Sequence, residues 1–464
     1  MRRILLALLL AGLCGAATRF VGEAAQASSF AITNVTVIDA SGAPPRPGMT
    51  VVVTGSRIAA LERTGTIELP RGARVIDGSG KFLIPGLWDM HVHLSYVGRS
   101  VLPLLLANGV TGVRDMGGDF TQVRAWRDSV ASGHLLGPRI KAAGPIVESG
   151  RWLQFAREAV QRAGGRDEAK LARRVGVDTP EDARRVVDSV AALGADFLKL
   201  RNAASREAFF ALAAAARRRG LPLVGHTPSN VSPEEASDSG QRSFEHQFLP
   251  PLDGMTPEAR MRLFRRFAEN GTAFVPTLIA NRGYRLLPDS LVLAVIADSA
   301  GVHEPRRRYV SRDLAEDWRV QIGMKQSERP HDWHAYHRST LRDLREMHSA
   351  GVPLLAGTDA AAPLVFPGFS LHEELELLVR DAGLTPLQAL RSATRNPAEF
   401  VELQDSLGSI APGKLADLVL LDANPLDDIR NTQRIRAVVA NGRLLERAAL
   451  DSLLAQARAE VARR

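Results

Sequence analysis

Short apolar runs alternate with longer stretches of helical periodicity along most of the chain. Between the apolar runs, residues 180–193 and 206–219 are rich in Ala, Arg and Glu and repeat apolar positions at helical spacing. This alternation predicts an α/β fold with a parallel sheet. The runs read as strands that carry polar side chains at or near their ends: 87–94, 195–200, 221–226, 242–246 and 352–359.

The polar residues on these runs are types that bind metals. His91 and His93 are two residues apart, so in a strand both imidazoles face one side while Val92 faces the packed layer. By itself a His-x-His pair is a weak signal, and two hydrogen-bonded core histidines are its more common explanation. The other runs carry Lys199, His226, His246 and Asp359. In a (β/α)8 barrel the carboxyl ends of all strands meet at one mouth, where these six residues would become neighbours.

The six residues, in this order, resemble the pattern of the amidohydrolase superfamily of metal-dependent hydrolases. That pattern has His-x-His after the first barrel strand, Lys after the fourth, one His after each of the fifth and sixth, and Asp after the eighth. Three flanking stretches are similar to its imidazolonepropionase-like and Xaa-Pro-dipeptidase-like branch: Ile84-Pro85-Gly86-Leu87, residues 109–115 and "GSIAPGKLADLVL" at 408–420. The resemblance implies a (β/α)8 TIM-type barrel with a smaller composite β-sandwich domain built from both chain ends.

Imidazole and carboxylate ligands suit zinc and similar divalent ions, whereas calcium and magnesium prefer oxygen ligands. An ordinary Lys199 ammonium beside two cations would be repelled, so this side chain must be neutral, chemically changed or outside the site. The resemblance implies that Lys199 is carboxylated to a carbamate shared by two divalent ions, with zinc as the expected metal. It further implies the ligand sets: His91, His93 and Asp359 for the first ion, and His226 and His246 for the second.

The reaction implied by the resemblance is hydrolysis of an amide or peptide C–N bond by a metal-activated hydroxide. Asp359 would be the proton shuttle between the attacking water and the leaving amine. A dipeptide, an N-acyl amino acid or a cyclic amide would be the small-molecule substrate. Arg201, two residues beyond Lys199, would face the same side of a continued strand and could bind a substrate carboxylate, although a surface ion pair would look the same.

Alternatives remain open for several residues. Lys199 could lie along a strand edge with its amine in solvent, and Asp359 could cap the following segment. A mononuclear deaminase or cyclic-amide hydrolase would use His91, His93, His226 and Asp359 without Lys199. A non-catalytic exported binding protein would keep only the fold.

Other histidines have weaker arguments. His331, His334 and His337 repeat at metal-like spacing, but they lie at the end of a charged and aromatic segment, 282–337. A helical surface is the favoured explanation, and a lid or a substrate contact is the alternative. That segment is placed where barrel loops shape a pocket. His372 opens a predicted helix after Asp359, where it would order the barrel mouth or lie on an exposed helix face.

The pattern divides the chain into five parts. Residues 1–27 read as a signal peptide, with Arg2 and Arg3 before an apolar stretch too short to span a membrane. The β-sandwich would take residues 28–84 and 406–450, the barrel 85–405, and a C-terminal helical tail 451–464. The chain is therefore expected to be exported to the periplasm or secreted. Lipid anchoring at Cys14 is the less favoured alternative, because Leu13 before it is larger than such sites require.

Composition adds two exclusions. Cys14 is the only cysteine, so the mature chain would form no disulfide. The formal net charge is +8, but basic residues have acidic neighbours, as in 184–188, and no nucleic-acid motif is present. The charge is expected to aid solubility or to attract an anionic substrate. No transmembrane segment is expected in the mature chain, and a homo-oligomer is compatible with the sequence.

Overall fold

The computed structural model describes residues 29–162, 168–246, 252–326 and 332–463. The predicted signal peptide, Cys14 and His331 lie outside these residues, so they stay predictions. Within the described residues, no helix is both long enough and apolar enough to cross a membrane.

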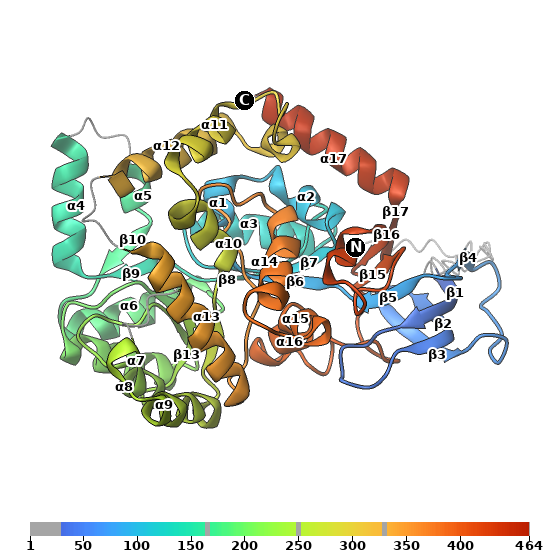
Figure 1. Cartoon of the computed structure of the whole chain (residues 1–464), viewed down its shortest axis with the longest axis horizontal. Coiled ribbons are helices and arrows are strands. Elements are labelled where there is room, and N and C mark those ends of the chain that lie inside the picture. Colours follow the sequence, from blue (N-terminus) through green and yellow to red (C-terminus); the bar gives the residue numbers. More distant parts are fainter. Residues whose placement is uncertain (1–28, 163–167, 247–251, 327–331, 464) are drawn as a thin grey trace, which may run out of the picture.

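Strands from both chain ends form one sheet, seen on the right of Figure 1. Its order is β17-β16-β15-β5-β1-β2-β3, with β4 paired to β1. The strands are β1 (Ser29–Val37), β2 (Arg46–Thr54), β3 (Arg57–Arg63), β4 (Arg74–Asp77), β5 (Phe82–Pro85), β15 (Leu418–Leu421), β16 (Ile435–Ala440) and β17 (Arg443–Glu446). The two ends meet where β5 pairs with β15 in antiparallel register.

This sheet encloses a buried apolar cluster of its own. Residues of β1, β2, β5, β15 and β16 contribute to it, among them Ile32, Val51, Leu83, Leu420 and Val439. The turn after β2 approaches the turn after β16, where a Cβ on Gly442 would overlap the Gly55 carbonyl oxygen, so the sheet curls around that core. The two chain ends therefore form one unit, as predicted, with all of its strands in a single hydrogen-bonded sheet.

Parallel strands make up the rest of the sheet structure. One sheet has the order β6-β7-β8 and the other β10-β9-β11-β12-β13-β14, and every pair in them is parallel. The strands are β6 (Leu87–Val92), β7 (Val110–Asp115), β8 (Arg139–Ala142), β9 (Ile146–Glu148), β10 (Arg174–Gly176), β11 (Leu198–Leu200), β12 (Leu223–Gly225), β13 (Gln241–Glu245) and β14 (Ala273–Val275).

Isolated parallel bridges link these sheets and the segment on either side of Asp359. The bridges are Ala143 to Phe197, Phe274 to Leu354 and Val92 to Ala360. They place the strands in the order that an eight-stranded α/β barrel requires. The predicted strand over 352–359 is not continuous, because its backbone hydrogen bonds go to different segments. The Ala356 N–H donates to the Ser392 carbonyl, whereas the Ala356 carbonyl accepts from the Met90 N–H.

Helices follow the strands, as the sequence pattern predicts. Two of them, α6 (Pro180–Leu193) and α7 (Arg206–Arg218), lie in the stretches predicted to be helical. A capping box at Thr179 begins α6, and Gly194 in the left-handed region ends it. The others up to α9 are α1 (Leu94–Val97), α2 (Val101–Ala107), α3 (Phe120–Ala131), α4 (Gly150–Arg162), α5 (Glu168–Leu171), α8 (Pro233–Asp238) and α9 (Pro257–Asn270), with the 3-10 turn η1 (Leu252–Gly254).

The C-terminal half is mainly helical. Its elements are α10 (Leu278–Asn281), η2 (Arg282–Leu286), α11 (Asp289–Ala297), η3 (Pro305–Tyr309), α12 (Arg312–Gln326), α13 (Trp333–Ser349), α14 (Phe369–Arg380), α15 (Pro386–Ser392), α16 (Arg395–Phe400), η4 (Ile429–Gln433) and α17 (Arg447–Ala462). The C-terminal helix thus begins at Arg447, earlier than the predicted residue 451. Figure 1 shows α17 running across the top of the molecule.

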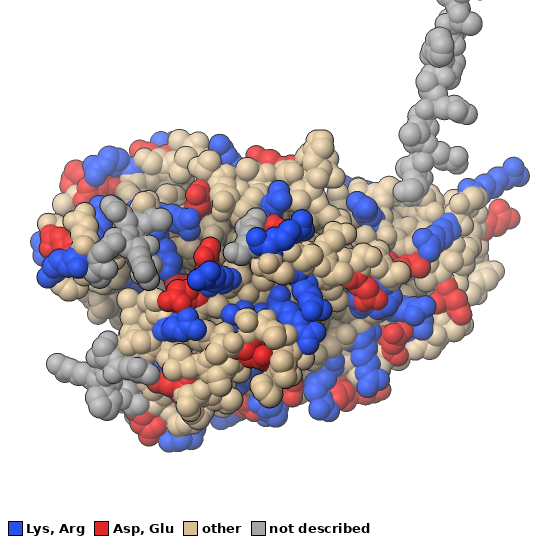
Figure 2. Space-filling model, turned by 90° about the horizontal axis from the view of Figure 1, so that it is seen from above, with Lys and Arg blue, Asp and Glu red and all other residues tan. Residues whose placement is uncertain are grey.

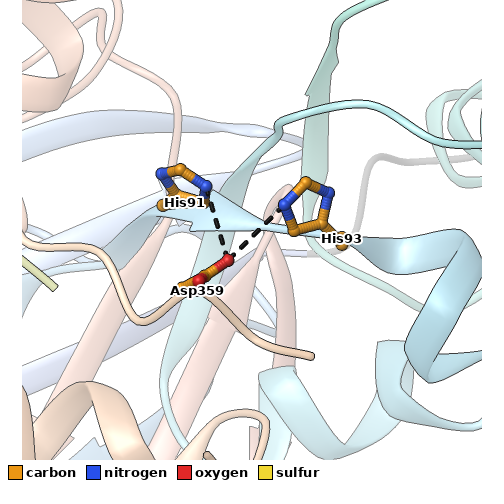
Figure 3. Close-up of side chains that lie close together, drawn as sticks. All are labelled: His91, His93 and Asp359. Carbon is orange, nitrogen blue, oxygen red and sulfur yellow. Dashed lines mark ion pairs between the residues drawn. The ribbon is translucent and has the colours of Figure 1, made fainter. Parts of the chain in front are cut away.

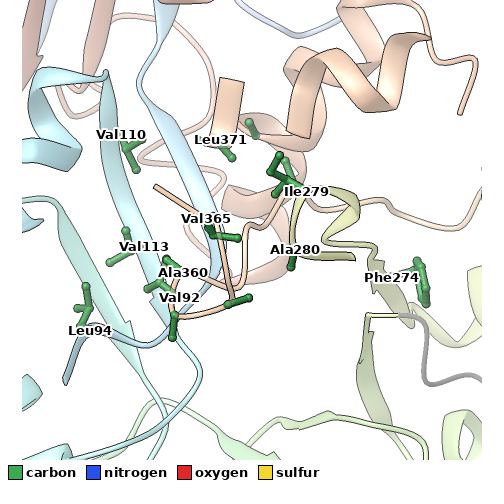
Figure 4. Close-up of a cluster of buried hydrophobic side chains, with 14 of the residues drawn as sticks. Val92, Leu94, Val110, Val113, Phe274, Ile279, Ala280, Ala360, Val365 and Leu371 are labelled. Carbon is green, nitrogen blue, oxygen red and sulfur yellow. The ribbon is translucent and has the colours of Figure 1, made fainter. Parts of the chain in front are cut away.

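The largest buried cluster lies between the parallel strands and their helices. Figure 4 shows Val92 in this cluster beside Ala360 and Leu94. Val92 therefore faces the packed layer, as the alternation in β6 predicts. This orientation directs the side chains on either side of it, those of His91 and His93, away from that layer.

The charged surface mixes both signs. Figure 2 shows Lys and Arg side chains over much of one face, with Asp and Glu between them. On α6, Arg184 pairs with Glu181 and Arg185 with Asp182, and all but Asp182 are largely exposed. These i, i+3 pairs confirm the prediction that this stretch is a solvated helix face.

Candidate metal centre

His91, His93 and Asp359 lie together where β6 ends (Figure 3). The Nε2 atoms of both histidines are 3.5 Å from Oδ1 of Asp359. The Asp359 N–H donates to the His91 carbonyl over 2.8 Å, which holds the carboxylate beside the two rings. Asp359 has a φ of 57°, a left-handed conformation that few residues other than glycine adopt. The backbone is thus held in an unfavourable conformation at the point where the three side chains meet.

Hydrogen bonds determine which nitrogen of each ring carries the proton. Nδ1 of His93 lies 2.8 Å from the Gly117 carbonyl, which can only accept, so Nδ1 must be the donor. Nδ1 of His91 lies 2.9 Å from Oε2 of Glu245, a carboxylate that also accepts from Arg114. Both rings therefore present the lone pair of Nε2 towards Asp359, the form in which histidine binds metals.

Two more histidines adjoin this group. His246 directly follows β13, and its Nε2 is 3.9 Å from Oδ2 of Asp359 while its Nδ1 is 2.7 Å from the Thr277 hydroxyl. Its ring centroid is 4.3 Å from that of His91 and 5.3 Å from that of His226. His226 directly follows β12, and its N–H donates to the Leu200 carbonyl of β11. The four imidazoles predicted from the sequence are thus neighbours.

Burial keeps these imidazoles neutral. It lowers the pKa of His93 to about 4 and that of His91, His226 and His246 well below the usual value, with the Lys199 charge adding to the effect. Neutral imidazole is the protonation state that binds a metal, so metal binding near neutral pH would need no proton loss from these rings.

Lys199 lies in the middle of β11 and is buried. Its amine has no hydrogen-bond partner among the described residues. Burial lowers its pKa to about 8, opposed by the nearby carboxylates of Glu245 and Asp359. A Lys with its amine in solvent is therefore excluded. Asp359 caps no helix either, since the next helix, α14, begins at Phe369 with Gly368 as its N-cap.

The donor set fits a transition metal. Nε2 of His91 is buried and has no hydrogen-bond partner among the described residues. Two ligands of a tetrahedral zinc ion, each about 2.1 Å from it, lie roughly 3.4 Å apart. The 3.5 Å separations between both Nε2 atoms and Asp359 match this spacing. These residues can therefore hold a divalent ion without a change in the backbone.

Comparison with known proteins agrees with this geometry. Residues 82–445 match the amidohydrolase family. The chain belongs to this family. It is 28% identical over 381 residues to imidazolonepropionase of Ralstonia nicotianae, which covers 80% of this chain and 85% of the relative. A solved structure from Bifidobacterium longum, provisionally assigned as a prolidase, is 27% identical with a TM-score of 0.67 and covers 93% of this chain and 99% of its own.

A third comparison concerns the fold alone. The chain matches the structure of a Xaa-Pro dipeptidase with bound methionine at 22% identity and a TM-score of 0.65, over 90% of this chain and all of the other. The family and the imidazolonepropionase-like and Xaa-Pro-dipeptidase-like resemblance predicted from the sequence are confirmed. The fold shared with these relatives is a TIM-type barrel with an additional domain.

Glu245 and Arg114, a buried ion pair that contacts His91, were not predicted from the sequence. Glu245 accepts from both His91 and Arg114, with Arg114 Nη2 at 2.7 and 2.8 Å from its two oxygens, and from the Ser243 hydroxyl. The Arg114 guanidinium also donates to the Met90 carbonyl and lies 5.0 Å from the Phe400 ring centroid. In the sequence, the only signal was the presence of charged residues in two short strands, Arg114 and Asp115 in β7 and Arg242 and Glu245 in β13.

Asp89 was also missed. Its carboxylate accepts from the backbone N–H groups of His91 and Thr358 and from the Thr358 hydroxyl. It therefore ties β6 to the segment that carries Asp359. Burial raises the pKa of Asp89 to about 7.

The remaining predicted residues lie apart from the three-residue group. Arg201, whose side chain is 40% exposed, donates to Glu148 over 2.7 Å, so it forms an ion pair, but with a buried carboxylate and not with a surface one. His372 is buried between Thr432 and the Asn108 carbonyl, which excludes an exposed helix face. His337, on α13, lies 3.2 Å from the Asn281 amide.

Proposed function

We propose that this protein is a binuclear metal-dependent hydrolase that cleaves an amide or peptide C–N bond. The barrel closes around eight strands, and its mouth holds the ions. His91, His93 and Asp359 would bind one ion, and His226 and His246 would bind the other. Lys199, carboxylated to a carbamate, would supply the ligand that the two ions share. Zinc is the ion that the four imidazoles favour.

The observation that carries this proposal is the meeting of His91, His93 and Asp359 beside a buried lysine amine without a hydrogen-bond partner among the described residues. An ammonium group would repel the ions, whereas a carbamate is an anion with two oxygen donors. The lowered pKa of Lys199 favours the neutral amine that reacts with carbon dioxide. The burial of Lys199 and its neutral histidine neighbours therefore suit the modified side chain.

Asp359 is proposed as the proton shuttle. Bound divalent ions would lower the pKa of a water molecule and polarise the scissile carbonyl. Asp359 would accept the proton of the attacking water at a carboxylate oxygen and pass it to the leaving nitrogen. Burial raises the pKa of Asp359 to about 6, which brings it closer to neutral pH, where an efficient acid and base must work.

A mononuclear cyclic-amide hydrolase is the second candidate. Among the described residues, the only group of three or more whose possible ligand atoms all lie within 4.8 Å of one another is His91, His93 and Asp359. Imidazolonepropionase, which matches 80% of the chain, is a relative whose name indicates a cyclic amide. In this case Lys199 would carry no carbamate, and His226 would complete the set. A deaminase would use the same ligands.

The number of ions distinguishes these candidates. We expect two divalent ions per purified native chain and one or none in Lys199→Ala, with retention of both in Lys141→Ala, a more exposed lysine paired with Asp196. Metal content is measured by mass spectrometry after dialysis. Thermal melts of each variant show whether it is folded, and acetate or propionate added to Lys199→Ala should restore metal if the missing group is a carboxylate.

The same samples test the modification itself. Growth or refolding with carbon-13-labelled bicarbonate should give one carbamate carbon signal per native chain and none in Lys199→Ala. One ion per chain, unchanged by Lys199→Ala, would contradict the binuclear proposal and favour the mononuclear hydrolase. A metal-loaded native protein that turns over no dipeptide, N-acyl amino acid, cyclic amide or aminopurine would favour a binding protein.

A further inference from the structure

A second polar cluster lies beside the proposed metal centre, between β9, β10, β11 and α4. Glu148, at the end of β9, is fully buried. Its Oε2 accepts from Nη1 of Arg201 over 2.7 Å and from Nη1 of Arg174 over 3.3 Å. Two guanidinium groups thus share one carboxylate oxygen. The shared carboxylate orients both guanidinium groups, because each of them donates one of its N–H groups to the same oxygen.

The cluster contains donors that the protein itself does not satisfy. Nε of Arg174 and the hydroxyl of Tyr96 are buried, and neither has a hydrogen-bond partner among the described residues. Buried donors of this kind are rare in proteins, since each loses its bonds to water without replacement. Their presence in one place indicates a ligand that accepts hydrogen bonds.

The charge of the cluster indicates the sign of that ligand. Arg173, Arg174 and Arg201 contribute three positive charges, whereas Glu148 contributes one negative charge. The Arg173 guanidinium lies 5.3 Å from the Tyr96 ring centroid. Burial and the charge of Arg201 both lower the pKa of Arg174, which shows that the two guanidinium groups repel one another. An anion would relieve this repulsion.

The cluster adjoins the proposed metal ligands. Arg201 is two residues after Lys199, and the Tyr96 ring centroid is 5.5 Å from that of His93. A molecule of dipeptide size could therefore reach the cluster while its amide bond lies at the ions.

An aromatic side chain covers the cluster. Trp152, near the start of α4, lies with its ring centroid 4.7 Å from the Arg201 guanidinium and 5.6 Å from that of Arg174. In Figure 1, α4 stands beside β9 and β10, at the end of the molecule away from the sheet of both chain ends. By excluding water from one side, the indole strengthens the interaction of both guanidinium groups with an anion.

We propose that Arg174, Arg201 and Tyr96 bind a carboxylate of the substrate, so that the enzyme selects dipeptides or N-acyl amino acids over uncharged amides. This inference rests on the proposed hydrolase function and names its substrate class. Arg174 and Arg201 donate to the carboxylate oxygens, Tyr96 donates its hydroxyl hydrogen, and Glu148 orients the guanidinium groups. The other end of the substrate extends away from the cluster.

Matched pairs of ligands test the proposal. The probes are a panel of dipeptides and N-acetyl amino acids, each with a free carboxylate, and the corresponding carboxamides. Charged hydrogen bonds of this kind correspond to about 10- to 100-fold in binding. Native enzyme should prefer the acids in kcat/KM by a factor in this range, mainly through KM. Arg174→Gln should reduce the preference to about twofold, with Arg174→Lys restoring part of it.

Binding is measured separately from turnover. Calorimetric titration of metal-loaded protein with the N-acetyl amino acids and their carboxamides should show the same preference for the acids, and the same loss in Arg174→Gln and Arg201→Gln. Arg184→Gln, an exposed arginine on α6, is the matched control and should behave as native. Metal content and thermal melts are recorded for every variant, to show that each is folded and loaded.

The outcomes separate this inference from the proposed function. Equal turnover or binding of acids and carboxamides would overturn the carboxylate site and leave the hydrolase proposal intact. A preference for acids that survives in both Arg174→Gln and Arg201→Gln would also overturn it. Absence of turnover on every probe contradicts the proposed function, whereas a calorimetric preference for acids that these two substitutions remove would still support the carboxylate site.

Discussion

At the scale of single residues, the proposed metal centre depends on side chains that do not reach it. Glu245 holds the His91 ring by its Nδ1, and Arg114 holds Glu245 with two hydrogen bonds. The Gly117 carbonyl does the same for His93. These partners determine the tautomer and orientation of each ring before any ion binds, which increases the basicity of the nitrogen that faces the ion.

Asp359 is expected to contribute more to turnover than to metal binding. In Asp359→Asn an amide oxygen remains as a ligand, but it cannot accept a proton at neutral pH. We predict that the variant retains most of its metal while kcat falls by about 10²- to 10⁴-fold, the usual contribution of a general acid and base. Metal per chain and kcat are measured on the same preparation. Asp128→Asn, an exposed position, serves as control, and near-native turnover in Asp359→Asn would contradict the assigned role.

At this scale the sequence predicted the proposed metal ligands better than the residues that hold those ligands in place. The positions of His91, His93 and Asp359 followed from strand ends that meet at one mouth. Glu245 and Arg114 could not be predicted in the same way, because a charged residue in a buried strand does not reveal its partner. Glu245 points to His91 only because β13 and β6 lie across the structure from each other, which is a property of the whole fold.

At the scale of elements, the close approach of β11 and β12 positions His226. Gly225, the last residue of β12, has a φ of 133°, and a Cβ there would overlap the Leu200 carbonyl oxygen. That same carbonyl accepts the His226 N–H over 2.9 Å. Only glycine allows both the backbone conformation and the contact, so the residue before the ligand determines where the ligand lies.

Gly225→Ala should therefore displace His226. We predict a loss of about 2–4 kcal/mol in the free energy of unfolding, from the strained φ and the overlap with Leu200 together. The metal content should fall as well. Denaturant unfolding and metal analysis measure the two effects. Gly220→Ala is the control, since Gly220 also has a positive φ but a Cβ there would meet nothing within 4 Å; a metal loss equal in both variants would contradict the explanation.

Elements were predictable where local pattern and tertiary structure agree. The helix over Pro180–Leu193 has a capping box, a proline in its first turn and a terminal glycine, all visible in the sequence. The run at 352–359 is apolar over most of its length, yet it forms one isolated bridge, at Leu354, because its N–H and carbonyl groups bond to several different segments. The hydrophobic pattern of a sequence does not show which segments its backbone hydrogen bonds will reach.

At the scale of the whole molecule, the two chain ends stabilise the strand that begins the metal site. β5 pairs with β1 and β15, and one residue, Gly86, separates it from β6, which carries His91. The Gly86 N–H donates to the Asp417 carbonyl over 2.8 Å. The C-terminal strands therefore contact the start of the barrel directly, and unfolding of their sheet should be transmitted to β6.

Leu420 offers a test of this coupling. It is buried in the core of the sheet, within β15, far along the chain from every proposed ligand. We predict that Leu420→Ala lowers the free energy of unfolding by about 2–5 kcal/mol, as loss of a buried leucine usually does. Because β5 continues into β6, release of metal and unfolding of the sheet should occur in one transition. A metal indicator measures the release, and circular dichroism measures the unfolding.

Leu291→Ala, at a position 48% exposed, is the control and should change the free energy of unfolding by less than about 0.5 kcal/mol. If the sheet of Leu420→Ala melted while the metal stayed bound through a separate, later transition, the two chain ends would form an independent domain and the proposed coupling would be wrong.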